Sequence, residues 1–367
     1  MTTSGIYIHI PFCKSFCPYC DFYKVKADET LAEKYKKAVV RSTASFSNVY
    51  KDRLIDTIYF GGGTPSAIDA SHIVDILNGI RSSFSVSPNC EITVECNPSS
   101  NLSEFLPAVA SAGVNRISLG MQSAVDDERK GLGRMADAAR VARAVELAKS
   151  CGISNISVDL MLGVPQQSLT SLDLSLEFLN SLDVTHVSAY MLKLEEGTNF
   201  KKRFDAGTLT LPSEDETVEF YNHTCDTLSS FGFAQYEISN FAKPGFESRH
   251  NLKYWTLGEY LGLGPAAHSF MDGKRFFFAP SLEEFIAGAL PTPDGEGGDF
   301  AERVLLNLRL TRGLVGDIPD DFFEKASKLG LQKYLFVGEE NGTRAVRLTR
   351  EGFLVSNSII GELLELI

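Results

Sequence analysis

The sequence predicts an α/β protein whose central sheet is parallel and buried on both faces. Six short runs rich in Ile, Val, Tyr or Thr recur over the first 190 residues, and segments with helical periodicity separate them. These runs are too apolar to be half exposed, which predicts a parallel sheet covered by helices. The six predicted strands are Gly5–Ile10, Ile55–Phe60, Glu91–Glu95, Asn115–Leu119, Ser154–Leu160 and Val184–Tyr190.

The segment Ala136–Ser150 illustrates the helical pattern between these strands. Val141 and Val145 fall on one helical face, while Arg140 and Arg143 lie elsewhere. Six strand–helix units within residues 1–200 could build either an open Rossmann-like sheet or a partial barrel. Periodicity alone does not separate these two architectures.

The rest of the chain divides where the pattern and composition change. The strand–helix alternation ends near residue 200, and residues 201–290 are expected to form an α+β extension. Residues 291–300 contain the run PTPDGEGG, which is typical of a linker. Residues 301–367 predict a small, mostly helical domain, with helices at Ala301–Leu308 and Asp320–Lys328 and a strand pair at Tyr334–Val337 and Ala345–Leu348.

Composition and charge narrow the class of protein. A hydrophobic content of 44% with 22% charged residues is typical of a soluble globular protein. The formal net charge of −12 argues against a nucleic-acid partner held through its phosphates. No apolar run reaches the roughly 18 residues that a membrane span needs, and residues 1–10 lack the pattern of a secretory signal. We therefore expect a cytoplasmic protein.

Three of the seven cysteines, Cys13, Cys17 and Cys20, lie within eight residues directly after the first predicted strand. Thiolates at this spacing on a tight loop can converge on a soft metal centre. A structural zinc site needs four ligands, and no fourth cysteine lies nearby. An iron–sulfur cluster is therefore favoured over zinc, with one iron left open for a small chelating molecule. The other four cysteines are scattered singly and are expected to be small buried side chains.

Polar or glycine-rich residues also follow the next four predicted strands. The second strand ends in Gly61-Gly62-Gly63-Thr64-Pro65, which suits a close backbone approach to a ligand but is equally typical of a structural turn. The residues at the next three strands are Glu95 and Asn97, Gln122 with Arg134 beyond it, and Asp159. Any one of these residues could be a helix cap or a satisfied buried polar group. Because the carboxyl ends of parallel strands meet at one edge, we expect the residues to converge on a common site.

The CxxxCxxC spacing, with an aromatic residue before its last cysteine, resembles the radical S-adenosylmethionine (SAM) superfamily. The runs around Tyr7, the GGGTP loop, VECNP, RISLGMQS and SVDLMLGVP resemble one branch of it. That branch contains the oxygen-independent coproporphyrinogen III oxidases (HemN) and the related HemW-type heme chaperones. The resemblance runs essentially from end to end, including the C-terminal domain, and it implies a partial, TIM-like (β/α)6 barrel.

The same resemblance implies the cofactors and their residues. A [4Fe–4S] cluster would be bound by Cys13, Cys17 and Cys20, with SAM on its open iron. The residues implied to line the SAM site are Tyr7, Tyr19, Gly62, Gly63, Thr64, Glu95, Gln122, Arg134 and Asp159. Some of their equivalents in the oxidases serve a second SAM, and the number used here is left open.

Two features of the sequence favour the chaperones over the oxidases. The oxidases carry a further cysteine two residues after the third, whereas Asp21-Phe22 follows Cys20 here. The segment from His250 to Trp255 is similar to the HNxxYW signature of the chaperones. An imidazole can be an axial ligand of heme iron, and we expect His250 in that role, with His268 as the reserve.

The sequence therefore predicts a heme chaperone that uses a [4Fe–4S] cluster and SAM. Its expected partners are heme, a heme-acceptor protein and an electron donor for the cluster. No basic amphipathic helix supports attachment to a membrane surface. The alternatives are oxidative decarboxylation of coproporphyrinogen III and, more remotely, radical chemistry on an unrelated substrate, so enzymatic activity is left open.

Overall fold

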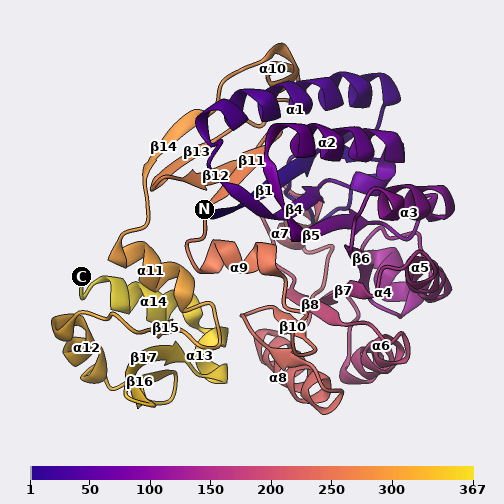
Figure 1. The fold of residues 1–367 in the computed structure, drawn as a ribbon. Coiled ribbons are helices and arrows are strands. Elements are labelled where there is room, and N and C mark those ends of the chain that lie inside the picture. Colours follow the sequence, from indigo (N-terminus) through magenta and orange to yellow (C-terminus); the bar gives the residue numbers. More distant parts are fainter. Residues whose placement is uncertain (1) are drawn as a thin grey trace.

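The computed structural model describes residues 2–367, and six parallel strands form its centre (Figure 1). Neighbouring strands follow chain order, with every pair parallel, as expected when helices make the connections. The six strands are β1 (Thr3–Ile10), β4 (Leu54–Gly62), β5 (Ser85–Cys96), β6 (Arg116–Gln122), β7 (Asn155–Leu162) and β8 (His186–Met191). All six predicted strands are confirmed.

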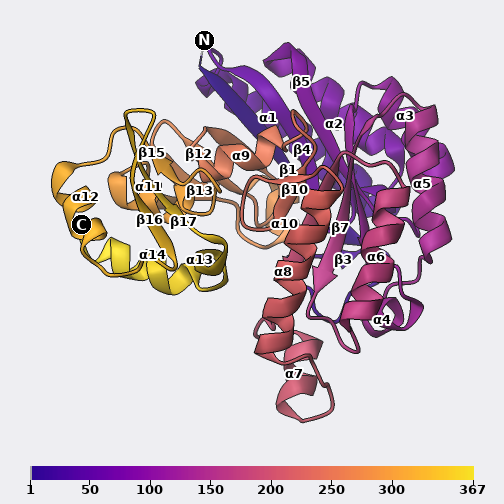
Figure 2. The ribbon, with the colours of Figure 1, turned by 90° about the horizontal axis from the view of Figure 1, so that it is seen from below.

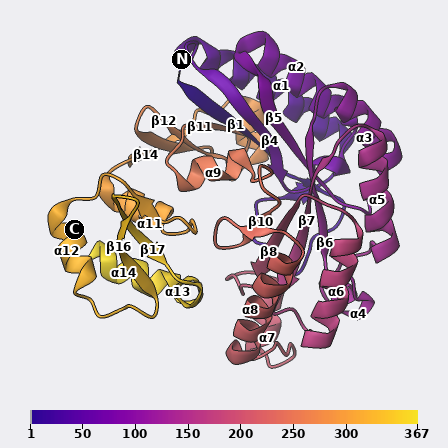
Figure 3. The ribbon, with the colours of Figure 1, turned by 60° about the horizontal axis from the view of Figure 1, so that its bottom comes forward.

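Helices cover the outer face of this curved sheet (Figures 2 and 3). Each pairs an apolar inner side with a polar outer side, as in α5, where Val141 and Val145 are buried while Arg140 and Arg143 are exposed. The outer helices are α1 (Glu29–Val49), α2 (Ala70–Ser83), α3 (Leu102–Ser111), α4 (Asp126–Gly131), α5 (Ala138–Ser150) and α6 (Leu169–Ser181). The prediction of a partial (β/α)6 barrel is confirmed, and the open Rossmann-like sheet is excluded.

The barrel does not close on itself, because the extension adds strands to both of its edges. At one edge β10 (Asn240–Ala242) pairs antiparallel with β8, and β9 (Ala234–Gln235) pairs antiparallel with β10. On the other edge, β11 (Tyr260–Leu263) lies parallel to β1, and β12 (His268–Met271) and β13 (Lys274–Phe277) continue as antiparallel strands. With one more strand, β14 (Thr292–Glu296), beyond β13, the result is a twelve-stranded mixed sheet.

Three short helices and one long one complete the extension. They are α7 (Asn199–Asp205), α8 (Glu214–Ser230), α9 (Arg249–Trp255) and α10 (Leu282–Ala287). Figure 3 shows α9 beside the open side of the barrel, between β11 and β10. Its side chains bond to residues near the amino ends of β4 and β5, so α9 lies at the base of the barrel.

The predicted linker, residues 291–300, is not a loose connection. Thr292–Glu296 form β14, the outermost strand of the large sheet, antiparallel to β13. An edge strand tolerates Pro293 because one side of its backbone needs no ladder partner. The Pro and Gly content that predicted flexibility here marks an exposed sheet edge.

The C-terminal region has the predicted mixture of helices and a strand pair. A third short strand joins the hairpin, giving a sheet in the order β15, β17, β16. It contacts the extension, where Asn307 donates a hydrogen bond to the carbonyl of Trp255 at 2.7 Å. Its elements are α11 (Phe300–Asn307), β15 (Leu314–Val315), α12 (Asp320–Ser327), β16 (Leu335–Glu340), β17 (Thr343–Leu348), α13 (Arg350–Leu354) and α14 (Ser356–Leu364).

Candidate cofactor site

The predicted cluster ligands lie on the loop after β1, at the carboxyl end of the barrel strands, here called the mouth. Cys13 ends the short strand β2 (Phe12–Cys13), which pairs with β3 (Val25–Lys26), and its Sγ lies 3.5 Å from Thr64 Oγ1. Cys17 and Cys20 are partly exposed. Lys24 Nζ donates to the Cys20 carbonyl at 2.7 Å, so the loop is held at both of its ends.

The donor set fits an iron–sulfur cluster chemically. All seven cysteines are free thiols. Within residues 2–367 no three His, Cys, Asp or Glu side chains stand close enough to hold a single metal ion. A cubane asks for a different arrangement, because each thiolate binds its own iron and the sulfur atoms surround the cluster. Three thiolates on one loop would bind three of its four irons.

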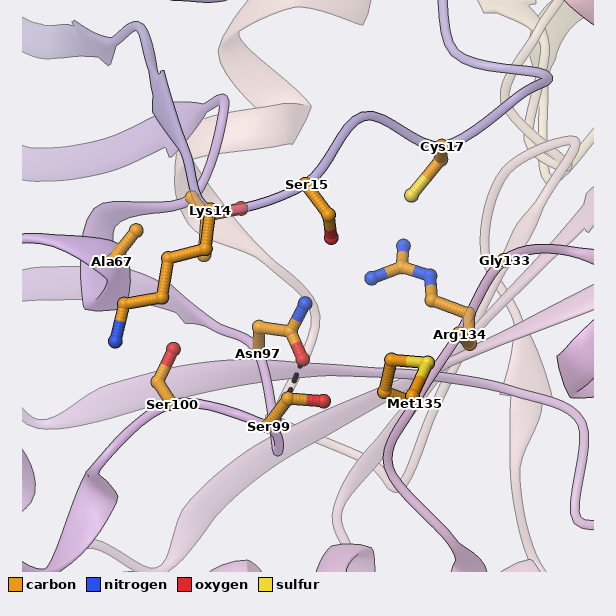
Figure 4. A pocket seen from close by; sticks show the side chains of 11 residues that line it. Lys14, Ser15, Cys17, Ala67, Asn97, Ser99, Ser100, Gly133, Arg134 and Met135 are labelled. Atoms are coloured by element: carbon orange, nitrogen blue, oxygen red, sulfur yellow. Dashed lines mark hydrogen bonds between the residues drawn. The ribbon is translucent and has the colours of Figure 1, made fainter. Parts of the chain in front are cut away.

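Two adjoining cavities run from the cysteine loop into the mouth, and they share Thr64, Asn97 and Arg134. Figure 4 shows the outer one. Arg134 extends toward Cys17 across the cavity in this view. The outer cavity also touches Lys14 and Met135. The inner cavity is lined by the predicted residues Gly63, Thr64, Glu95, Gln122, Arg134 and Asp159, together with Cys96, Asn97, Ser118 and Gly120.

The glycine loop after β4 packs against the end of β1. A Cβ atom on Gly62, whose φ is +106°, would lie 2.5 Å from the His9 ring, and one on Gly63 would lie 2.7 Å from the Ile10 carbonyl oxygen. The N–H groups of Gly63 and Thr64 donate to the carbonyls of Ile10 and Phe12. Because these donors are already used, the loop serves to hold the cysteine segment in place and is not a phosphate cradle.

Two half-buried carboxylates face the inner cavity. Glu95 accepts hydrogen bonds from Tyr59 Oη at 2.8 Å and from the Gly62 N–H at 3.2 Å. Burial, together with the charge of Asp159, raises the pKa of Glu95 to about 7. Burial also raises the pKa of Asp159, which accepts from Ser118 Oγ at 3.0 Å. Neither carboxylate has a cationic side chain as a hydrogen-bond partner, so the pocket suits a ligand that carries positive charge.

Gln122 and Arg134 also line the inner cavity. Gln122 ends β6 at a register shift and adopts φ of +69°, a left-handed conformation that turns the chain into the mouth. The Arg134 guanidinium donates to Tyr19 Oη at 3.1 and 2.9 Å, which links the cavity lining to the cysteine loop. A cation beside two carboxylates can hold a molecule that carries both an ammonium and a carboxylate group.

Six of the predicted SAM residues line the inner cavity: Gly63, Thr64, Glu95, Gln122, Arg134 and Asp159. Gly62 and Tyr19 line neither cavity, but they bond to Glu95 and Arg134, which do. Tyr7 lies on the inner face of β1, with its Oη 3.1 Å from His9 Nδ1, and it also lines neither cavity. Sequence reasoning left out Ser118 and Lys14, and it noticed Asn97 without assigning it to the site. Asn97 directly follows the end of β5, so its position at a strand end was the usable signal.

The predicted heme ligand His250 is not available for coordination in this structure. Its side chain is fully buried. Nδ1 lies 2.8 Å from Thr57 Oγ1, and Nε2 lies 2.8 Å from Tyr254 Oη, so both ring nitrogens are engaged. The reason is tertiary: α9 docks at the base of the barrel and directs this ring between β1 and β4. The reserve, His268, is exposed at the start of β12.

Comparison with known proteins agrees with this geometry. Residues 7–179 match the model of the radical SAM superfamily. The chain is 33% identical to the heme chaperone HemW of Lactococcus lactis, covering 98% of this chain and 97% of that protein. It is also 33% identical to HemW of Bacillus subtilis over 98% of each. The structure of Escherichia coli coproporphyrinogen III oxidase (HemN) superimposes with a TM-score of 0.83 at 20% identity, covering 100% of this chain and 91% of that one.

Proposed function

The chain belongs to the radical SAM superfamily and to its HemW family of heme chaperones, and from that premise we propose that it binds heme and passes it to an acceptor protein. The observation that carries this proposal is the identity of 33% to chaperones along almost the whole of both chains. The likeness to HemN supports the fold alone. No helix among residues 2–367 is long and apolar enough to cross a bilayer.

The proposed resident cofactors are a [4Fe–4S] cluster on Cys13, Cys17 and Cys20 and one SAM beside it. When bound, these groups would supply one-electron chemistry at the mouth. The chain's own part is to hold them. Thr64 and Lys24 fix the cysteine loop, while Glu95 and Asp159 would attract the cationic parts of SAM and Arg134 its carboxylate.

The proposed partners follow from the same assignment. Heme is cargo, the acceptor is a protein that lacks its heme, and an electron donor reduces the cluster. The net charge of −12 gives no support to a nucleic-acid partner.

Two assays on one anaerobically reconstituted sample test the proposal. A chaperone should bind hemin with a defined Soret band and should release it to an apoprotein such as apomyoglobin. It should form no vinyl groups from coproporphyrinogen III in the presence of SAM and a reductant. Decarboxylation without heme transfer would replace the chaperone assignment with that of an oxidase.

A further inference from the structure

A heme carrier needs a group that binds the iron, and the histidines of this chain differ sharply in their freedom to do so. Five of the six engage at least one ring nitrogen in a hydrogen bond inside the protein. They are His9, His72, His186, His223 and His250. His268 is exposed, and no hydrogen bond between described residues involves its ring. Among the described histidines it is therefore the one whose ring is exposed and has neither nitrogen in an internal hydrogen bond.

His268 also lies close to the mouth. It begins β12, directly after the turn that leaves the carboxyl end of β11. β11 runs parallel to β1 with Gly262 opposite Tyr7, and β12 returns antiparallel beside it with Phe270 opposite Tyr260. The register therefore places His268 in the row of Tyr7, separated from it by Gly262. Two strand spacings amount to about 10 Å, so a heme at His268 would lie near Tyr7 of β1, outside the two cavities of the cofactor site.

The surroundings of His268 offer apolar contact to a flat ligand. Its ring stacks on Phe277, with the ring centres 5.2 Å apart and the planes inclined by 23°. Phe277 pairs in turn with Thr292 of the edge strand β14. Two residues before Thr292, Leu290 exposes 87% of its side chain at the same end of the sheet. A free imidazole stacked beside an aromatic ring suits a porphyrin, which is apolar on its faces and carries iron at its centre.

His250 would have to give up much more to reach an iron. Its ring would leave the bonds to Thr57 and Tyr254, and these buried hydroxyl groups would lose partners. Each buried polar group left without a partner costs about 1–3 kcal/mol. Tyr59 and Tyr7 also stack around the ring, with centres 5.2 and 6.4 Å away.

We infer that His268, at the mouth end of β12, is the axial ligand of the heme that this protein carries. A lone pair of its imidazole forms the bond to iron and displaces a weakly held water, with no change in oxidation state. The inference rests on the proposed chaperone function and adds the position of the cargo to it.

Hemin titration of the full-length protein tests the inference. The wild type should bind hemin with a Soret band typical of histidine ligation. His268→Ala should bind at least tenfold more weakly and show a shifted band, and added imidazole should restore the wild-type spectrum. His223→Ala is the matched control, because His223 is a partly exposed histidine bonded to Asp173 and distant in sequence from β12. It should bind hemin as the wild type does.

The outcomes separate the two proposals. An unchanged affinity and spectrum in His268→Ala overturns the ligand assignment while leaving the chaperone function intact. The ligand assignment is also overturned if His250→Ala, shown by circular dichroism to be folded, loses the histidine spectrum while His268→Ala keeps it. The chaperone function would again be left intact. A wild type that binds no hemin removes the proposed function, and the ligand assignment with it.

Discussion

The two ends of the barrel differ in the partners of their carboxylate side chains. At the base, Glu91 accepts the N–H groups of Arg249 and His250 at 3.1 and 3.0 Å, and Asp56 pairs with Lys253 at 2.9 Å. At the mouth, Glu95 and Asp159 border a cavity, and burial raises the pKa of both.

This difference shows how a buried polar residue can be interpreted. Where its partners come from the same chain, as at the base, it stabilises the fold. Where a carboxylate is held beside a cavity and no cationic side chain bonds to it, burial disfavours its charged form and a cationic ligand can stabilise it. The HNxxYW segment belongs to the first class, although its sequence suggests the second.

The largest effect is expected from the mouth loop. Replacing Cys13, Cys17 and Cys20 together by Ala should abolish the cluster, since no other cysteine lies on that loop. Anaerobically reconstituted wild type should contain about four irons and four sulfides per chain, and the variant close to none. Iron and sulfide analysis measures this difference.

The control for this variant is Cys151→Ala, a partly buried free cysteine after α5. It should keep the full iron content. Iron retained by the triple variant, or stoichiometric zinc in the wild type, would contradict the assignment of the mouth.

The next largest effect is expected at the base of the barrel, where His250→Ala should lower the stability of the folded protein. His250→Ala removes a fully buried ring and leaves Thr57 and Tyr254 without their partner. We expect the free energy of unfolding to fall by about 2–4 kcal/mol, measured by urea titration. His268→Ala, which replaces an exposed histidine, should change the free energy of unfolding by less than about 0.5 kcal/mol.

The loss of stability caused by His250→Ala should also depend on pH. Burial lowers the pKa of His250 from 6.5 to about 3, so the unfolded chain binds this proton first as the pH falls. The stability contributed by His250 is complete above its ordinary pKa of 6.5 and is lost progressively toward pH 3. The difference in stability between wild type and variant should therefore shrink over that range. A constant difference would mean that the ring is not buried in its neutral form.

The smallest effect is expected from Glu95→Gln. Because the pKa of Glu95 is raised to about 7, its negative charge is lost as the pH falls through neutrality. Wild-type affinity for SAM should fall about tenfold, or 1.4 kcal/mol, between pH 8 and pH 6, while the variant stays weak and nearly constant. Calorimetric titration of reconstituted protein measures both. Equal pH profiles would show that Glu95 does not face the ligand.

The same variant should be more stable than the wild type at pH 8. The folded pKa of Glu95 lies above its ordinary value of 4.5, so the folded chain keeps a proton that the unfolded chain has already released. The stability associated with this proton is lost as the pH rises through 7. Glutamine removes that penalty, and thermal unfolding at pH 5 and pH 8 should show a smaller decrease for the variant.

Much of the barrel and its mouth could be predicted because the signals are local. Apolar β-rich runs and the intervening helical periodicity located all six strands, with ends within about three residues except at the start of β5, which begins at Ser85 and not at Glu91. Polar residues such as Glu95, Gln122 and Asp159 stand at or near strand ends, and parallel strands bring those ends to one edge. Asn97 shows the limit of such a prediction, because no local feature of the sequence distinguishes a residue that contacts a ligand from one that forms a turn.

The extension could not be predicted in the same way, because its partners are distant in sequence. β11 pairs with β1 across about 250 residues of chain, Tyr260 lying opposite Gly5. Residues 292–296, with their Pro and Gly content, become a strand only because β13 offers an edge to pair with. Local propensity carries no information about such pairings.

The sequence by itself determined the strand–helix alternation, the cysteine loop and the residues of the mouth. Tertiary structure alone decided which histidine is buried and which is free. His250 stands in the run SRHNLKYW and His268 in the glycine- and alanine-rich run GLGPAAHSF, and neither run shows whether its histidine is buried. Only the docking of α9 against the base and of β12 against β11 gives His250 two internal partners and leaves His268 exposed. The availability of a ligand depends on contacts between distant segments, and periodicity and spacing do not encode them.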